Sequence, residues 1–114
     1  MDVEITFEKE LNMLIENEDC IESLREIFLK EINNTEQYKS KIDKLLRFSK
    51  GNNLIRSEAW GYYYLGWYNF DISEYEKAVK DFLTSYDLFE KHNNKYELAY
   101  ACNGLTNVLS DGTV

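Results

Sequence analysis

The sequence predicts an all-α protein of antiparallel helices, folded as a single domain over residues 1–114. The chain has no proline and only five glycines, so it contains few residues that interrupt helices. Apolar residues recur at spacings of three and four along almost the whole chain, and nowhere do they alternate as in a half-buried strand. Short polar segments with capping residues separate these periodic stretches. We therefore expect about five to six helices and no sheet.

Two helices are predicted before the middle of the chain. The first covers residues 1–17, with its periodic part at about 3–17, and carries a single apolar face. The second begins at Asp19, because Glu22 follows three residues later and completes a capping-box pattern. A turn at Asn33-Asn34 ends this second helix.

The third helix is expected to begin with Asn34 or Thr35 as its cap and to run to about residue 50. The segment Gly51-Asn52-Asn53 is expected to end it as a left-handed C-terminal cap. Its bases could attract an acidic partner, although a solvated helix face is the simpler interpretation. They are Lys39, Lys41, Lys44, Arg47 and Lys50.

The fourth helix, residues 54–71, contains the stretch YYYLGWYNF from Tyr62 to Phe70. Helical spacing places Tyr62 and Gly66 on one side of this helix and Tyr63 and Trp67 on the opposite side. A helix that is apolar on both sides is buried on both sides. We therefore expect it to be an inner helix of a stacked layer.

Two further helices complete the prediction. Ser73 and Glu76 form a capping box, which predicts a fifth helix that starts at Ser73 and ends near Lys91. A sixth helix over 95–110 ends at Asp111-Gly112. The two cysteines, Cys20 and Cys102, lack the spacing of a zinc site or a disulfide framework, and we interpret them as reduced packing residues.

An internal repeat relates the fourth and sixth helices. When the chain is shifted by 38 residues against itself, Tyr62 aligns with Tyr100 and Gly66 with Gly104. The two helices are therefore predicted to be the same element in successive repeats. The expected division is an N-terminal helix at 1–17, a degenerate helix pair at 19–50, a clear repeat at 54–92 and the first helix of a following repeat at 95–110.

This repeat resembles the tetratricopeptide repeat (TPR) family, in which helix pairs stack into an α-solenoid. The family pattern W-x2-L-G-x2-Y…A-x3-F matches Tyr62-x2-Leu65-Gly66 and then Ala78-x3-Phe82. Asn69 replaces the second aromatic residue, no proline closes the repeat, and the period exceeds 34 residues. The resemblance implies a set of repeat-packing residues in which small side chains allow close helix crossing. They are Tyr62, Leu65, Gly66, Ala78, Phe82 and Gly104.

In TPR arrays the first helix of each repeat lines a concave groove that holds a peptide or protein partner. Carried over by alignment, this groove would be lined by Trp60, Tyr63, Trp67 and Asp71 in one repeat and by Leu98, Ala101, Leu105 and Leu109 in the next. Aromatic residues of this kind are enriched in binding hot spots. The alternative is that the rings are core, covered by neighbouring helices or by a second subunit.

Catalysis and several classes of partner are not expected from the composition. His92 is the only histidine, and no phosphate-binding glycine loop or metal-ligand spacing is present, so we predict no enzyme, cofactor or metal site. The net charge of −8 argues against nucleic acid. No apolar run is long enough to span a membrane, and the acidic N-terminus does not resemble a signal peptide. These features favour a cytoplasmic protein.

Longer-period repeats of this type resemble the N-terminal TPR arrays of bacterial cytosolic signalling proteins, which precede a diguanylate cyclase (GGDEF) or histidine kinase domain. The expected function is therefore a non-catalytic protein- or peptide-binding module with a sensory role. The alternatives are an oligomerisation domain and the peptide-sensing half of a transcription regulator. Because the sixth helix carries many apolar residues, we also expect self-association through it, and expect the chain to be part of a longer array.

Overall fold

The computed structural model describes residues 3–31 and 34–112, and this part of the chain is all-α, as predicted. Six α-helices follow one another without a strand among the described residues. They are α1 (Val3–Glu16), α2 (Ile21–Glu31), α3 (Thr35–Gly51), α4 (Ile55–Asp71), α5 (Tyr75–Lys91) and α6 (Lys95–Asn107). A 3-10 turn, η1 (Glu18–Cys20), precedes α2, and a π-helical turn, η2 (Val108–Gly112), follows α6. Asn33 of the predicted turn lies outside the described residues.

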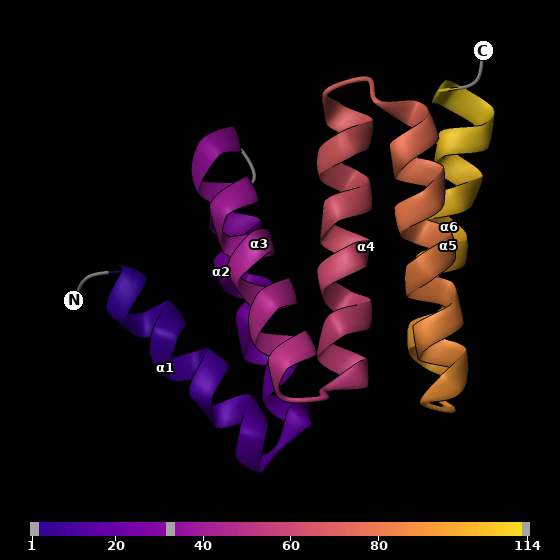
Figure 1. Cartoon of the computed structure of the whole chain (residues 1–114). Coiled ribbons are helices and arrows are strands. Elements are labelled where there is room, and N and C mark those ends of the chain that lie inside the picture. Colours follow the sequence, from indigo (N-terminus) through magenta and orange to yellow (C-terminus); the bar gives the residue numbers. More distant parts are fainter. Residues whose placement is uncertain (1–2, 32–33, 113–114) are drawn as a thin grey trace.

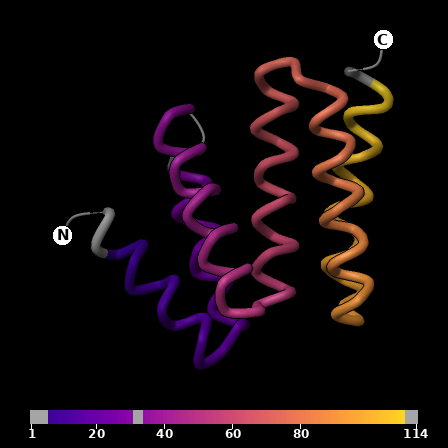
Figure 2. Tube along the Cα trace, viewed as in Figure 1, coloured from indigo at the N-terminus to yellow at the C-terminus, as the bar shows by residue number. Residues whose placement is uncertain are grey.

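Helix α4 occupies the middle of the molecule, as expected for an inner helix. It packs against α3 on one side and against α5 on the other, and it also contacts α6. In Figure 1, α3, α4 and α5 stand next to one another, while α1 and α2 form a V at the N-terminal end. The trace in Figure 2 shows the chain reversing direction at each connection from α3 to α6. The molecule is a slab of 42 × 32 × 21 Å.

Three identical turns connect α3 to α4, α4 to α5 and α5 to α6. In each turn the middle residue has a positive φ, with 56° at Asn53, 65° at Ser73 and 59° at Asn93. The next backbone N–H then donates to the carbonyl five residues earlier, for example from Leu54 to Ser49 at 2.9 Å. This is the Schellman motif, which satisfies the last carbonyls of a helix. Because the turns recur every 20 residues, all four helices continue the same antiparallel zigzag.

These turns locate the predicted cap after α3 and correct the capping prediction at Ser73. Of the predicted cap Gly51-Asn52-Asn53, Gly51 still lies within α3 and Asn53 is the residue with the left-handed conformation. Ser73 is the left-handed residue of its turn rather than a helix cap, and the N-cap position of α5 is Glu74 without a side-chain cap. A serine cannot occupy the extended N-cap conformation and the left-handed turn conformation at once.

The capping box predicted at Asp19 is also wrong. Asn17 caps the short η1 turn by accepting from the backbone N–H of Asp19 at 2.9 Å, and α2 begins only at Ile21. Asp19 pairs with Arg56, and Glu18 accepts from the backbone N–H of Ser57 at 2.9 Å. The acids of this turn therefore connect η1 to the start of α4.

The predicted close helix crossing centres on the ring of Phe82. A Cβ added at Gly66 would lie 2.7 Å from this ring, and one at Gly104 would lie 2.5 Å from it. Phe82 is thus enclosed between α4 and α6, and Ala78 is fully buried beside it. The two glycines are 38 residues apart, whereas α4 and α6 begin 40 residues apart. The 38-residue shift of the sequence against itself therefore aligns the two glycines that contact Phe82, and it does not align the first residues of α4 and α6.

Two other predicted packing residues belong to the larger core. Tyr62 and Leu65 are half-buried against the larger cluster, which contains residues from α1 to α6. The ammonium of Lys50 lies 5.2 Å from the Tyr62 ring, so this ring lies against α3. Tyr62 therefore packs toward α3 and not toward Phe82, the residue at the predicted close crossing. Cys102, expected to be a packing residue, is exposed, and Lys41, expected on a solvated face, is buried.

Candidate functional site

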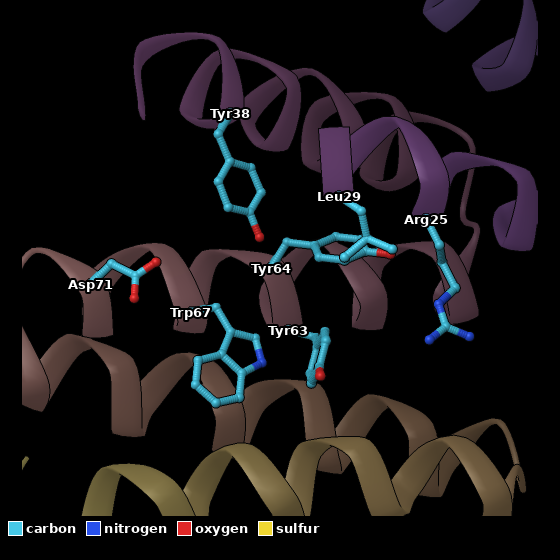
Figure 3. Close-up of a pocket in the computed structure, with 7 residues that line it drawn as sticks. All are labelled: Arg25, Leu29, Tyr38, Tyr63, Tyr64, Trp67 and Asp71. Carbon is cyan, nitrogen blue, oxygen red and sulfur yellow. The ribbon is translucent and has the colours of Figure 1, made fainter. Parts of the chain in front are cut away.

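A cavity of about 230 Å³ opens between α2, α3 and α4. Figure 3 shows its lining side chains, which come from all three helices. Four of them are aromatic, and a cation and a carboxylate lie at opposite ends of the row. The lining residues are Arg25 and Leu29 of α2, Tyr38 of α3, and Tyr63, Tyr64, Trp67 and Asp71 of α4.

The helical repeat places these side chains on one surface. On α4, Tyr63, Trp67 and Asp71 are four residues apart, so they lie one above another along one face. On α2 the same spacing aligns Arg25 with Leu29. The Tyr63 and Trp67 rings lie edge to face, with 6.3 Å between their centroids. Trp67 also packs edge-on against Phe82 of α5 at 5.4 Å, which fixes the position of its indole.

Tyr64 brings a buried hydroxyl group to the cavity wall. Its side chain is 7% exposed, and the Phe28 ring stacks on it at 4.2 Å between centroids. The Tyr64 Oη has no hydrogen-bond partner among the residues that the structure describes. A buried hydroxyl without a partner costs about 1–3 kcal/mol. A buried polar group without a partner calls for an explanation, such as an ordered water or a bound group.

Asp71 is the last residue of α4 and carries a carboxylate without a cationic partner in the described ranges. Burial raises the pKa of its carboxyl group above the ordinary value. The negative end of the helix dipole also disfavours a negative charge at this position. Burial, followed by the charge of Asp71, raises the pKa of Tyr38, so its hydroxyl stays protonated. In Figure 3 this hydroxyl points from α3 toward α4.

Arg25 occupies the other end of the cavity and is held by aromatic faces. Its guanidinium lies 5.3 Å from the centroid of the Trp60 ring and 5.0 Å from that of Tyr100. Cation–π contacts of this length are attractive. Because Arg25 belongs to α2, Trp60 to α4 and Tyr100 to α6, these three helices contribute to one common surface.

A buried polar network supports this surface. Glu97 is 7% exposed and accepts hydrogen bonds from Nε1 of Trp60 and Nδ2 of Asn94. Nε of Arg56 donates to Glu97 at 2.6 Å, and the same guanidinium pairs with Asp19. The network joins η1, α4 and α6 across 41 residues of sequence between Arg56 and Glu97. It fixes Trp60, and through Trp60 the platform on which Arg25 rests.

The structure brings together three of the four groove residues predicted on α4. Tyr63, Trp67 and Asp71 all line the cavity. Trp60 does not line it, because it is 2% exposed and lies in the core, as the alternative interpretation expected for the rings.

The groove residues predicted on the sixth helix, which correspond to α6 and η2, lie elsewhere. Ala101 is fully buried in the core. Leu98 lines a separate hollow of about 210 Å³ beside Phe89. Leu105 packs against the cluster around Phe82, and Leu109 is exposed. These four residues therefore do not form one surface with the cavity.

Sequence reasoning did not find the parts of the site that α2 and α3 contribute. Leu29 extends the apolar positions of α2, and Tyr38 falls on the apolar stripe that α3 turns toward the core. Arg25 gives no signal, because a single base among acids on an amphipathic helix is typical of a solvated position. Their roles depend on how α2 crosses α4, which no local pattern specifies.

The arrangement offers binding chemistry. Aromatic walls supply contact area, two hydroxyl groups can donate or accept, and the two ends carry opposite charges. No group of three or more His, Cys, Asp and Glu side chains within residues 3–31 and 34–112 is placed to hold a metal ion. Of the helices in that same part of the chain, none is both long enough and apolar enough to cross a membrane.

Comparisons with known proteins give no assignment. No family model, no curated protein and no solved structure matches the chain.

Proposed function

We propose that this chain is a non-catalytic, TPR-type module that binds a peptide or a segment of a partner protein at the cavity between α2, α3 and α4. The main supporting observation is the unpartnered Tyr64 hydroxyl at the wall of an aromatic cavity. A second is the Arg25 contact with Trp60 and Tyr100, because it places α2, α4 and α6 on one surface. In a TPR array the first helix of each pair lines the groove. If α2–α3 and α4–α5 are two successive pairs, then α2, α4 and α6 are the first helices of three repeats.

The proposed setting is a bacterial cytosolic signalling protein, in which the module senses a partner and regulates an output domain such as a GGDEF diguanylate cyclase. The support for this setting is the longer-period TPR resemblance. A module of this kind needs no metal or cofactor of its own, and the charge of −8 favours a partner with basic residues.

A peptide-display selection against the folded chain tests the proposal. Selected peptides are expected to lose binding to a Tyr63→Ala variant, because Tyr63 is half-buried and lines the cavity. Tyr96→Ala is the control, because Tyr96 is 89% exposed and lies outside the cavity. If no peptide is enriched, or if both variants bind equally well, this cavity is not the peptide site.

Oligomerisation through the C-terminal end is the second candidate. It is favoured by exposed apolar side chains there, Tyr96 at 89% and Leu109 at 58%. Analytical ultracentrifugation at high concentration tests it. Self-association should disappear in a Tyr96→Ala/Leu109→Ala double variant, and a strict monomer of the unmodified chain would exclude this candidate.

A further inference from the structure

We infer that the cavity accepts a lysine side chain of the partner peptide, with the ammonium group at Asp71 and a peptide carbonyl at the Tyr64 hydroxyl. This inference rests on the proposed peptide-binding function and specifies the chemical group that the peptide presents. It follows from the size of the cavity, the charges at its two ends and the unpartnered hydroxyl.

The volume fits one long side chain. A cavity of about 150 Å³ is enough to hold benzene. At about 230 Å³, this cavity holds the four methylenes and the nitrogen of a lysine with room for part of the peptide backbone. It is smaller than the roughly 300–1,000 Å³ typical of sites for drug-sized molecules. A side chain delivered by a peptide therefore fits better than a large free ligand.

The charges favour a cation at the Asp71 end. Asp71 is an exposed residue at one end of the cavity and has no ion pair among the described residues, and partial burial of its carboxyl group raises its pKa. A bound ammonium would compensate that charge and could donate to the Tyr38 hydroxyl as well. Arg25 does not compete for this position, because it stands at the opposite end and is held over Trp60 and Tyr100.

The aromatic walls of the cavity suit both the charge and the apolar stem of a lysine side chain. Aromatic rings attract cations, and they also cover the apolar stem that a lysine carries behind its ammonium. Tyr63 and Trp67 are half-buried, so each ring keeps part of its surface for such a contact. The net charge of −8 attracts basic peptides from a distance at low ionic strength.

The Tyr64 hydroxyl favours a peptide over a free amine. Its oxygen is covered in the empty cavity, so a neighbouring side chain must move before the hydroxyl can donate to a backbone carbonyl of the peptide. Leu29 lines the same cavity and is 64% exposed, which leaves it room to move. A free alkylammonium ion has no carbonyl and cannot use this contact.

Capped pentapeptides of sequence Gly-Gly-X-Gly-Gly test the inference, with X as lysine, Nε-acetyllysine, norleucine or glutamate, and n-butylammonium as the free amine. Binding to the 114-residue chain is followed by the NMR shift of the Trp67 indole N–H. We expect the lysine peptide to bind at least about tenfold more tightly than the other three peptides, and about 3- to 10-fold more tightly than n-butylammonium. Asp71→Asn should weaken the binding of the lysine peptide and of n-butylammonium by about 10- to 100-fold. Asp87→Asn, an equal charge change at an exposed site on α5, should leave both unchanged.

Tyr64→Phe should weaken the lysine peptide about 3- to 10-fold and leave n-butylammonium unchanged. If the norleucine or glutamate peptide binds more tightly than the lysine peptide and causes the same Trp67 shift, the lysine assignment is wrong. The cavity would still be a peptide-binding site. An equal loss of lysine-peptide affinity in Asp71→Asn and Asp87→Asn would show that only the net charge matters. That result would also overturn the lysine assignment. If none of these peptides and no displayed peptide shifts the Trp67 signal, the proposed peptide-binding function fails as well.

Discussion

Replacing Tyr64 with phenylalanine should stabilise the protein while weakening peptide binding. The ring would keep its stacking on Phe28, and only an oxygen without a hydrogen-bond partner would be removed. An unpartnered buried hydroxyl costs about 1–3 kcal/mol, so the free energy of unfolding should rise by about 1 kcal/mol or more. With an unfolding entropy of about 2.1 cal/mol/K per residue over 114 residues, 1 kcal/mol corresponds to about 4 °C in Tm.

Urea denaturation followed by circular dichroism measures this change, with Tyr96→Phe as the control. Tyr96 is exposed, so its hydroxyl is hydrated in both states and its loss should leave stability within about 0.5 kcal/mol. A Tyr64→Phe variant less stable than the unmodified chain would contradict the reasoning. It would show that the hydroxyl has a partner in solution.

Three further substitutions test the fold. Gly66→Ala should destabilise the protein by about 1–3 kcal/mol, because the added Cβ overpacks against Phe82. Gly51→Ala should stabilise it by about 0.5–1 kcal/mol, because a Cβ at Gly51 meets nothing within 4 Å. Equal effects of the two substitutions in thermal melts would refute the close crossing. Ser73→Asn should stabilise by up to about 1 kcal/mol, since asparagine tolerates a left-handed φ better than serine, and a loss of stability would show that the serine hydroxyl matters. Glu97→Gln should cost about 1.5–3 kcal/mol in urea denaturation, because the buried Arg56 guanidinium keeps only Asp19 as a carboxylate partner, and a cost below about 1 kcal/mol would mean that the network is hydrated.

Much of the fold follows from local sequence patterns, and the errors lie at the caps. Apolar spacing predicted each helix to within a few residues, because burial of one face dominates helix formation in a protein of this size. Ser73 and Asp19 were misassigned as caps because the capping-box pattern specifies residue types and not backbone conformation. At Ser73 the Schellman turn took precedence, and at Asp19 the ion pair with Arg56 did.

The site was predictable only where it depends on a single helix. Tyr63, Trp67 and Asp71 share a face of α4, so their spacing alone placed them together. Arg25 joins them only because α2 crosses α4, which is a tertiary arrangement without a local signal. Glu97 looked like an ordinary acid in the first turn of α6, and its burial depends on Arg56, 41 residues away.

A two-dimensional NMR titration of the chain with a display-selected peptide tests the central claim most directly. The account predicts shift changes concentrated at the cavity, at the Trp67 indole and the backbone amides of Arg25, Leu29 and Tyr63, with little change on the exposed face of α5. Shift changes confined to α6, which includes Tyr96, with none at the Trp67 indole, would contradict the account. They would place the binding surface at the C-terminal end.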